Sequence, residues 1–253
     1  MSNNAYLRTY GPIRRFQLFG IIGGLAWPST ITYNQTINHL YSENLGPSHC
    51  ANLILVQTDF GQVVKWLISD QWQKVANALL SLARQLELGG ADFIVIACNT
   101  VHKVVPSTQD QLRVPILHIV EVTSAKILEL GFRKVGLLGS APTMTDEYFI
   151  SHLARYGIEV LLPVEEDRKM VHHALDTELT RGIFLRETRG RSREHPVPTT
   201  RPIAITPGKQ RSALTAPRPI GLAPFDAIIG PRVPGEARNK PNMPQHARLS
   251  YTD

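Results

Sequence analysis

Short apolar runs alternate with amphipathic stretches from residue 16 to about residue 181, and this alternation restricts the fold more than any other feature. Leu53–Gln57 and Phe93–Ala97 are almost wholly apolar, as strands covered on both faces are. Between them, Gln71–Leu88 repeats apolar residues at helical spacing and stops at two glycines. Strands in turn with helices predict an α/β fold built on parallel sheet. The other expected strands are Phe16–Ile22, Pro115–Val120, Lys134–Leu138 and Ile158–Leu162. The other expected helices run from Ser29 to about Tyr41, from about Val101, and from about Glu165 to Arg181.

The composition changes abruptly after Arg191. Residues 191–253 hold 11 of the 18 prolines, 10 of the 27 basic residues and 4 of the 21 acidic residues, so the formal net charge of +6 lies entirely within them. Proline recurs there too often for a helix or a central strand. Because such a segment buries too little apolar surface to offset its ordering entropy, we predict a disordered tail. We expect its charge to be solvated and to bind no nucleic acid, since aromatic residues for base stacking are not interleaved with it.

Cysteine content and hydropathy exclude several classes of protein. The two cysteines, Cys50 and Cys98, cannot form a disulfide framework, and their scarcity fits a reducing compartment. The longest nearly uninterrupted apolar run, Leu18–Trp27, is about half of the roughly 20 residues that cross a bilayer. The opening residues also lack the pattern of a secretory leader. We therefore expect a cytoplasmic protein with no membrane partner, and no metal, because the spacings of metal ligands do not occur.

Small and polar residues follow the first two expected strands, at the edge of the sheet where ligands gather. The glycines after the first strand are spaced G-x-x-G-G, which departs from the dinucleotide-binding pattern. They could let backbone approach an anion, with Ser29 or Thr30 capping the next helix, or they could form a plain tight turn. After the second strand, Asp59 is better interpreted as a helix cap than as a substrate contact.

The third strand end carries the most reactive group in the sequence, within Ala97–His102. Cys98 directly follows an apolar strand and precedes a helix, whose N-terminus stabilises anions and lowers the pKa of a thiol. Asn99 and Thr100 add an amide and a hydroxyl beside it. This favours a reactive thiol over a small buried hydrophobe. His102 is either a base for that thiol or part of the helix–sheet interface.

Together these strand ends resemble the aspartate/glutamate racemase family, the cofactor-independent amino-acid racemases. The stretches that carry the resemblance are IIGGLAWPSTITYNQTIN (Ile21–Asn38), VQTDF (Val56–Phe60), ACNTVHKV (Ala97–Val104), PILHIVEVT (Pro115–Thr123), KVGLLGSAPTM (Lys134–Met144) and the segment Ile158–Phe184. The resemblance implies two similar α/β lobes, residues 14–114 and an incomplete 115–190, with the active site between them. Residues 191–253 form the separate tail.

The resemblance also implies a reaction on aspartate or glutamate without pyridoxal phosphate or any other cofactor. One cysteine thiolate removes the α-proton and a second cysteine thiol returns one from the opposite face. Cys98 matches the first of these cysteines. The positions that match the family's substrate-lining residues are Leu25, Ser29, Gln57, Asn99, Thr100 and Thr143. A homodimer is compatible with the resemblance.

The second catalytic cysteine of the family has no counterpart after Cys98. Cys50 precedes the second strand and lies roughly 23 Å from its carboxyl end, at about 3.3 Å per residue. The tail is either a shifted reading frame or a genuine divergent terminus, and in both cases we expect weak or absent activity. Two alternatives stay open: a non-catalytic ligand-binding or regulatory protein that keeps the carboxylate pocket, and another reaction on the same fold, such as hydantoin racemisation or arylmalonate decarboxylation.

Overall fold

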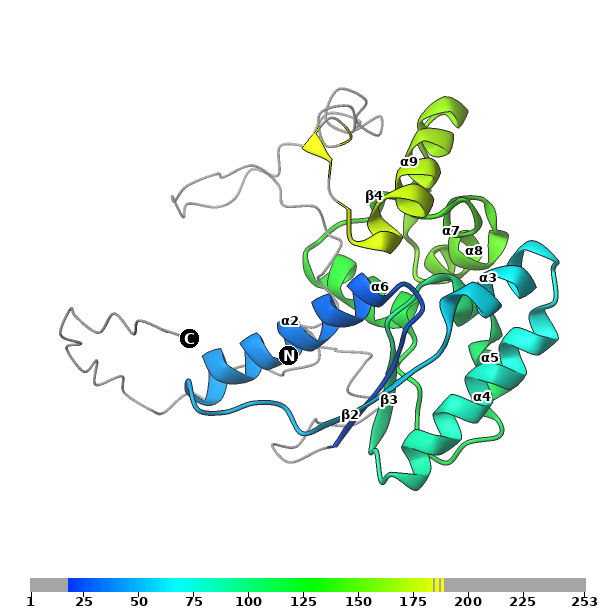
Figure 1. The fold of residues 1–253 in the computed structure, drawn as a ribbon. Coiled ribbons are helices and arrows are strands. Elements are labelled where there is room, and N and C mark those ends of the chain that lie inside the picture. Colours follow the sequence, from blue (N-terminus) through cyan, green and yellow to red (C-terminus); the bar gives the residue numbers. More distant parts are fainter. Residues whose placement is uncertain (1–17, 184, 187, 189–253) are drawn as a thin grey trace, which may run out of the picture.

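The computed structural model, which describes residues 18–183, 185, 186 and 188, contains two parallel sheets (Figure 1). The first sheet has the order β2-β1-β3, formed by β2 (Leu53–Gln57), β1 (Phe19–Gly23) and β3 (Phe93–Ile96). The second pairs β4 (Lys134–Gly136) with β5 (Glu159–Leu161). All strand pairs are parallel, so the predicted α/β class is confirmed.

Helices cover both faces of the first sheet (Figure 1). On one face lies α2 (Trp27–Leu45), and on the other lie α3 (Phe60–Ile68), α4 (Trp72–Leu88) and α5 (Val105–Gln109). Successive residues of β1 alternate between these faces, as the period of a strand requires: Ile21 packs toward α2 and Ile22 toward α4. This double cover explains why β1 and β3 are apolar throughout.

The second sheet is accompanied by α6 (Ile119–Glu129), α7 (Ala141–Thr145), α8 (Glu147–Arg155), α9 (Glu165–Thr177) and the 3₁₀ helix η2 (Leu179–Arg181). Its core is a small cluster in which α6 and α8 meet. Helix α6 also contacts the first sheet: Val122 belongs to the α2 side of that sheet's core, while Val120 belongs to the second core. The two sheets with their helices, called here the first and second lobes, are thus joined through α6.

The prediction of a strand over Pro115–Val120 is wrong. This segment makes a single parallel bridge, between Ile94 and Ile116, and then turns into α6. His118 caps the helix, because its Nδ1 accepts the Val120 N–H at 3.3 Å. An apolar run of this length fits a buried strand and a buried helix start equally well, and the side-chain cap decides in favour of the helix.

Neither Ser29 nor Thr30 caps α2. The helix begins two residues earlier, after Ala26, and Pro28 occupies its first turn, where the fixed φ and the missing N–H of proline are favourable. The Thr30 hydroxyl instead accepts the Gly24 N–H at 3.0 Å. It therefore holds the loop between β1 and α2, which is the loop that borders the site.

Several sequence predictions concern residues outside the described part of the chain. The tail, residues 191–253, is one of them, and the division into 14–114 and 115–190 stays a prediction. No helix among the described residues has both the length and the apolar character that a membrane span needs. The same residues contain no group of three or more His, Cys, Asp or Glu side chains arranged to hold a metal ion.

Candidate active site

The loops that follow β1, β2 and β3 meet at one edge of the first sheet, because the three strands are parallel. The Thr58 N–H donates to the Gly23 carbonyl at 3.3 Å. Gly24 has a φ of +78°, and a Cβ there would lie 2.3 Å from the Thr58 carbonyl oxygen. Only glycine fits at this position. The glycines after β1 therefore form a tight turn against the neighbouring loop.

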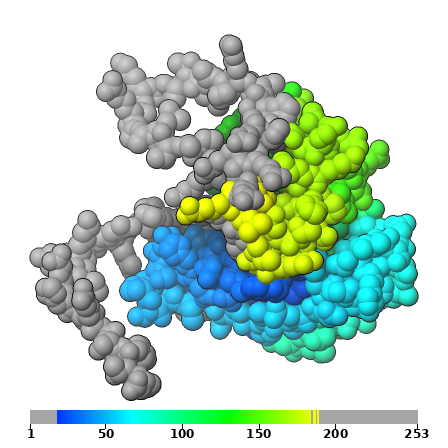
Figure 2. All heavy atoms as spheres, turned by 45° about the horizontal axis from the view of Figure 1, so that its top comes forward, coloured from blue at the N-terminus to red at the C-terminus, as the bar shows by residue number. Residues whose placement is uncertain are grey.

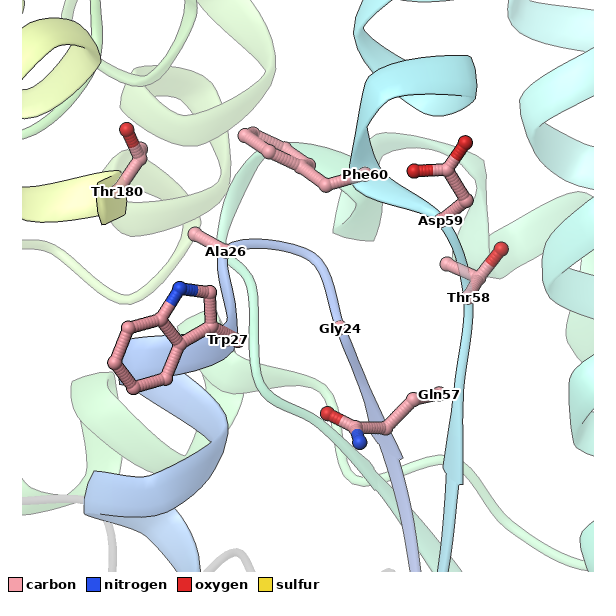
Figure 3. Close-up of a pocket in the computed structure, with 8 residues that line it drawn as sticks. All are labelled: Gly24, Ala26, Trp27, Gln57, Thr58, Asp59, Phe60 and Thr180. Carbon is pink, nitrogen blue, oxygen red and sulfur yellow. The ribbon is translucent and has the colours of Figure 1, made fainter. Parts of the chain in front are cut away.

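A cavity of about 300 Å³ opens at this edge between the β1 and β2 loops and the second lobe (Figure 3). It is lined by Gly24, Ala26, Trp27, Gln57, Thr58, Asp59, Phe60 and Thr180. Thr180 comes from η2, and the Phe60 ring points toward it (Figure 3). The described lining residues include one carboxylate, Asp59, and no Lys, Arg or His. Asp59 Oδ1 accepts the Gly61 N–H at 3.1 Å, so the interpretation as a cap of α3 is confirmed.

The second lobe closes over the cavity at Trp27. Gly182 has a φ of +75°, and a Cβ there would lie 2.8 Å from the Trp27 ring. Figure 2 shows the yellow segment that contains η2 resting on the blue segment at the start of α2. The cavity is therefore bounded by both lobes. Of the residues predicted for the site, Gln57 lines it and Cys98 does not.

Cys98 is half-buried at the carboxyl end of β3. Burial raises the pKa of its thiol, although backbone hydrogen bonds from Val101 and Thr100 lower it in part. The expected lowering by a helix N-terminus is therefore outweighed. The element that follows is only a five-residue 3₁₀ helix, η1 (Thr100–Val104), which offers a weaker dipole than a long α-helix. Cys98 is thus a thiol that becomes a thiolate at raised pH.

Tyr33 of α2 lies within electrostatic reach of Cys98. Burial, and after it the negative charge of the Cys98 thiolate, raise the pKa of its phenol far above the ordinary value. The phenol therefore stays protonated beside the thiol. Tyr33 carries no motif signal of its own, so it could not be predicted from the sequence.

His102 does not act as a base for the thiol. Its side chain is fully buried, and its Nδ1 lies 2.7 Å from the backbone oxygen of Cys98. Burial lowers the pKa of His102 to about 4, which makes this imidazole too weak a base to take a proton from a thiol. Of the two roles left open for His102, the structure supports the one in the interface.

A row of hydroxyls joins two of the predicted substrate-lining residues. Thr100 Oγ1 lies 3.2 Å from Ser140 Oγ, which in turn lies 3.1 Å from Thr143 Oγ1. Thr143 is 2% exposed, so its hydroxyl is turned into this row. Ser140 was missed, although the rule that ligands gather at strand ends would have found it, since it follows β4 closely.

The other predicted site residues differ in exposure. Gln57 is exposed and lines the cavity, and Asn99 is exposed beside Cys98. Ser29 is half-buried in the first turn of α2, whereas the Leu25 side chain belongs to the hydrophobic core. Cys50 is exposed ahead of β2, at the end of the sheet opposite to Cys98, as the sequence predicted.

Comparison with known proteins gives one consistent family. The family model for Asp/Glu/Hydantoin racemase matches residues 22–194. The broad specificity amino-acid racemase RacX of Bacillus subtilis (strain 168) is 36% identical over 88 residues, which are 35% of this chain and only 38% of RacX.

Two solved structures resemble larger parts of the chain. A putative Asp/Glu racemase from Yersinia pestis has a TM-score of 0.65 and 35% identity. An aspartate racemase homologue from Pyrococcus horikoshii OT3 has a TM-score of 0.61 and 30% identity. Each match covers 71% of this chain and 78% of the other.

Proposed function

This chain belongs to the Asp/Glu/Hydantoin racemase family, and from that premise we propose that it is an amino-acid racemase that works without pyridoxal phosphate. The observation that carries the proposal is the position of Cys98, a half-buried thiol that follows β3 at the carboxyl edge of the first sheet, the edge at which the cavity also opens. Its proposed products are D-amino acids, made in the cytoplasm. A homodimer is part of the proposal.

In the proposed reaction the Cys98 thiolate takes the α-proton of the substrate. The electron pair of the broken C–H bond moves onto the α-carbon and its carboxylate, so the thiolate becomes a thiol. Because an amino-acid α-proton is very weakly acidic, the site must hold the developing charge with fixed donors and exclude water. In the proposal these donors come from the row formed by Thr100, Ser140 and Thr143, which begins two residues after Cys98.

Inversion needs a second proton donor on the opposite face of the α-carbon. The sequence holds one cysteine besides Cys98, and Cys50 lies at the wrong end of the sheet. We therefore propose that this chain exchanges the α-proton with solvent faster than it inverts the carbon. A single base tends to return the proton to the face from which it came.

Aspartate and glutamate are the proposed substrates, following the family and the similarity to an aspartate racemase homologue. A substrate panel should add lysine and serine, because Asp59 is the one charged group among the described residues that line the cavity. A carboxylate there repels an acidic side chain and attracts a basic one.

Racemisation is tested by incubating each L-amino acid with the full chain and separating the enantiomers by chiral chromatography. We expect Cys98→Ser to lower the rate about 100-fold or more, as the loss of a general base does. Cys50→Ser is the matched control and should keep the parent rate. Equal rates in the Cys98→Ser variant and the parent would contradict the proposal.

Because Cys50 lies at the wrong end of the sheet to be the second proton donor, a second candidate function is also favoured. This is a ligand-binding protein that keeps the pocket without the chemistry. In that case calorimetry would show an amino acid binding with equal affinity to the parent chain and to Cys98→Ser. Solvent deuterium would then not enter the α-position with either protein.

A further inference from the structure

Three aromatic side chains connect the second lobe to the turn that carries Cys98, which we call the thiol turn (residues 98–102). Tyr148 of α8 donates its hydroxyl proton to the His102 backbone oxygen at 2.9 Å. His118 Nε2 lies 2.5 Å from the same hydroxyl. Within the thiol turn, His102 Nδ1 lies 2.7 Å from the Cys98 backbone oxygen. Both of these backbone carbonyls are therefore held by side chains.

The hydrogen bonds define where the protons lie. His118 Nδ1 accepts the Val120 N–H, so the proton of this imidazole sits on Nε2 and is donated to Tyr148. Tyr148 then uses its own proton for the carbonyl of His102. His102 must carry its proton on Nδ1, because a carbonyl can only accept. Each link of the series has one donor and one acceptor.

The two imidazoles of the series are buried, and Tyr148 is half-buried. The rings of His102 and His118 contact edge to face at 5.1 Å, and His152 of α8 stacks on His118 at 4.9 Å. Both His102 and His118 are nearly inaccessible to solvent. Polar networks of this kind rigidify the groups they join. Among the described residues, His102 Nε2 is the one buried side-chain atom of the series that has no hydrogen-bond partner.

We propose that Tyr148 and His102 are positioning residues that hold the thiol turn so that its backbone N–H groups point at the Cys98 sulfur. Backbone hydrogen bonding from Val101 and Thr100, both within this turn, lowers the pKa of the Cys98 thiol in part against the effect of burial. Holding the two carbonyls keeps these donors in place, and donors aimed at the sulfur stabilise the thiolate. The second lobe thereby controls the reactivity of a thiol that belongs to the first. The inference rests on the proposed function only in naming Cys98 as the reacting group.

The test measures alkylation of Cys98 by iodoacetamide as a function of pH. All variants carry Cys50→Ser, so that Cys98 is the sole thiol of the chain. The midpoint of the profile reports how well the thiolate is stabilised, while the plateau at high pH reports access to the sulfur. Tyr148→Phe removes only the hydroxyl. Tyr156→Phe, in the same hydrophobic cluster of the second lobe, is the matched control.

We expect Tyr148→Phe to move the midpoint to higher pH and to slow alkylation below the midpoint about 5-fold, the effect of roughly 1 kcal/mol from one lost hydrogen bond. Tyr156→Phe should leave the midpoint unchanged. His102→Asn, which keeps a donor near Nδ1, should shift the midpoint less than His102→Phe. An unchanged midpoint in Tyr148→Phe would overturn the proposal.

A higher plateau with the same midpoint would also overturn it, since that result means only that the lobe interface has loosened. This readout does not depend on turnover. If Tyr148→Phe shifts the midpoint and no amino acid is racemised or exchanged, the positioning role stands and the proposed function fails. If the parent chain exchanges the α-proton but Tyr148→Phe leaves the midpoint unchanged, the proposed function stands and the positioning role fails.

Discussion

The two sheets of this molecule are built from similar strands but differ in how they are covered. Every residue of β1 and β3 is buried, whereas every residue of β4 and β5 is exposed or half-buried. Large apolar side chains such as Leu138 and Val164 are exposed beside the second sheet. A parallel sheet normally has both faces covered. The edge strand β2 of the first sheet is also half-buried or exposed. We therefore expect most of the stability of the described fold to come from the packing around β1 and β3.

The second lobe has a different part in the site. It supplies Ser140 and Thr143 to the row of hydroxyls, Thr180 to the cavity and Tyr148 to the thiol turn. A thinly covered lobe thus contributes residues to the cavity, to the row of hydroxyls and to the contacts of the thiol turn in the other lobe. We therefore expect substitutions in the core of the first lobe to change mainly stability, and substitutions of these second-lobe residues to change mainly the site.

The largest expected effect comes from matched leucines in the two regions. Leu86 of α4 is 0% exposed under the first sheet, and Leu138 is 54% exposed after β4. Leu86→Ala should lower the free energy of unfolding by about 3–5 kcal/mol, the cost of a buried cavity, while Leu138→Ala should lower it by less than about 1 kcal/mol. Urea unfolding followed by circular dichroism measures both. Equal losses would show that the two sheets carry the stability alike.

Acid should weaken the contact between the lobes. Burial lowers the pKa of His102 to about 4 and the pKa of His118 to about 3. At His118 the neighbouring His102 and His152 lower the pKa further. Unfolded histidines bind protons near pH 6.5, so this stability is complete above that pH and is lost as the pH falls toward 4. The slope is about 1.4 kcal/mol per pH unit for each histidine.

The measurement is the urea midpoint at pH 7.5 and at pH 5.0. His102→Asn should reduce the drop between the two, whereas His173→Gln, at an exposed position, should leave it unchanged. A parent chain of equal stability at both pH values would show that these imidazoles are not buried as neutral groups.

The smallest of the three effects concerns the ion pair that links η1 to α8. Lys103 Nζ lies 2.5 Å from Asp146 Oδ2 and 4.5 Å above the Trp72 ring. Although burial opposes ionisation, the hydrogen bonds from Lys103 and from the Tyr148 N–H hold the pKa of Asp146 below its ordinary value. Asp146→Asn keeps a cap for α8 and loses the charge.

We expect Asp146→Asn to lower the free energy of unfolding by no more than about 1 kcal/mol, since the pair is partly exposed. The loss should shrink in 1 M salt, because salt screens the attraction. Thermal unfolding at low and high salt measures it. A loss that is independent of salt would assign the effect to the helix cap instead.

Much of the first lobe could be predicted from the sequence, because apolar runs that alternate with amphipathic stretches indicate parallel strands between helices. The bounds of Leu53–Gln57 were predicted to the residue, but the prediction that this strand is buried is wrong, because it lies at the edge of the sheet and its residues are half-buried or exposed. Cys98 was placed correctly at the end of β3. Pro115–Val120 failed because a short apolar run does not distinguish a strand from a capped helix. The cap depends on His118, whose role requires the three-dimensional contacts.

The contacts between the two lobes could not be predicted either, because they join residues that lie far apart in the sequence. Ser140 and Tyr148 lie 40 and 46 residues from their partners Thr100 and His102. Nothing in the local pattern pairs them, since hydroxyls on a loop and on a half-buried helix face are common. The sequence could therefore place each candidate at a strand end, and the structure was needed to show which of them meet.

The most direct test of the account is the exchange of the substrate α-proton in deuterium oxide, followed by proton NMR on L-aspartate, L-glutamate and L-lysine. The account predicts that the α-proton signal of at least one of these disappears with the parent chain and with Cys50→Ser. The same signal should persist with Cys98→Ser. If Cys98→Ser exchanges the proton as fast as the parent does, or if no amino acid exchanges at all, the central claim that Cys98 removes the α-proton is contradicted.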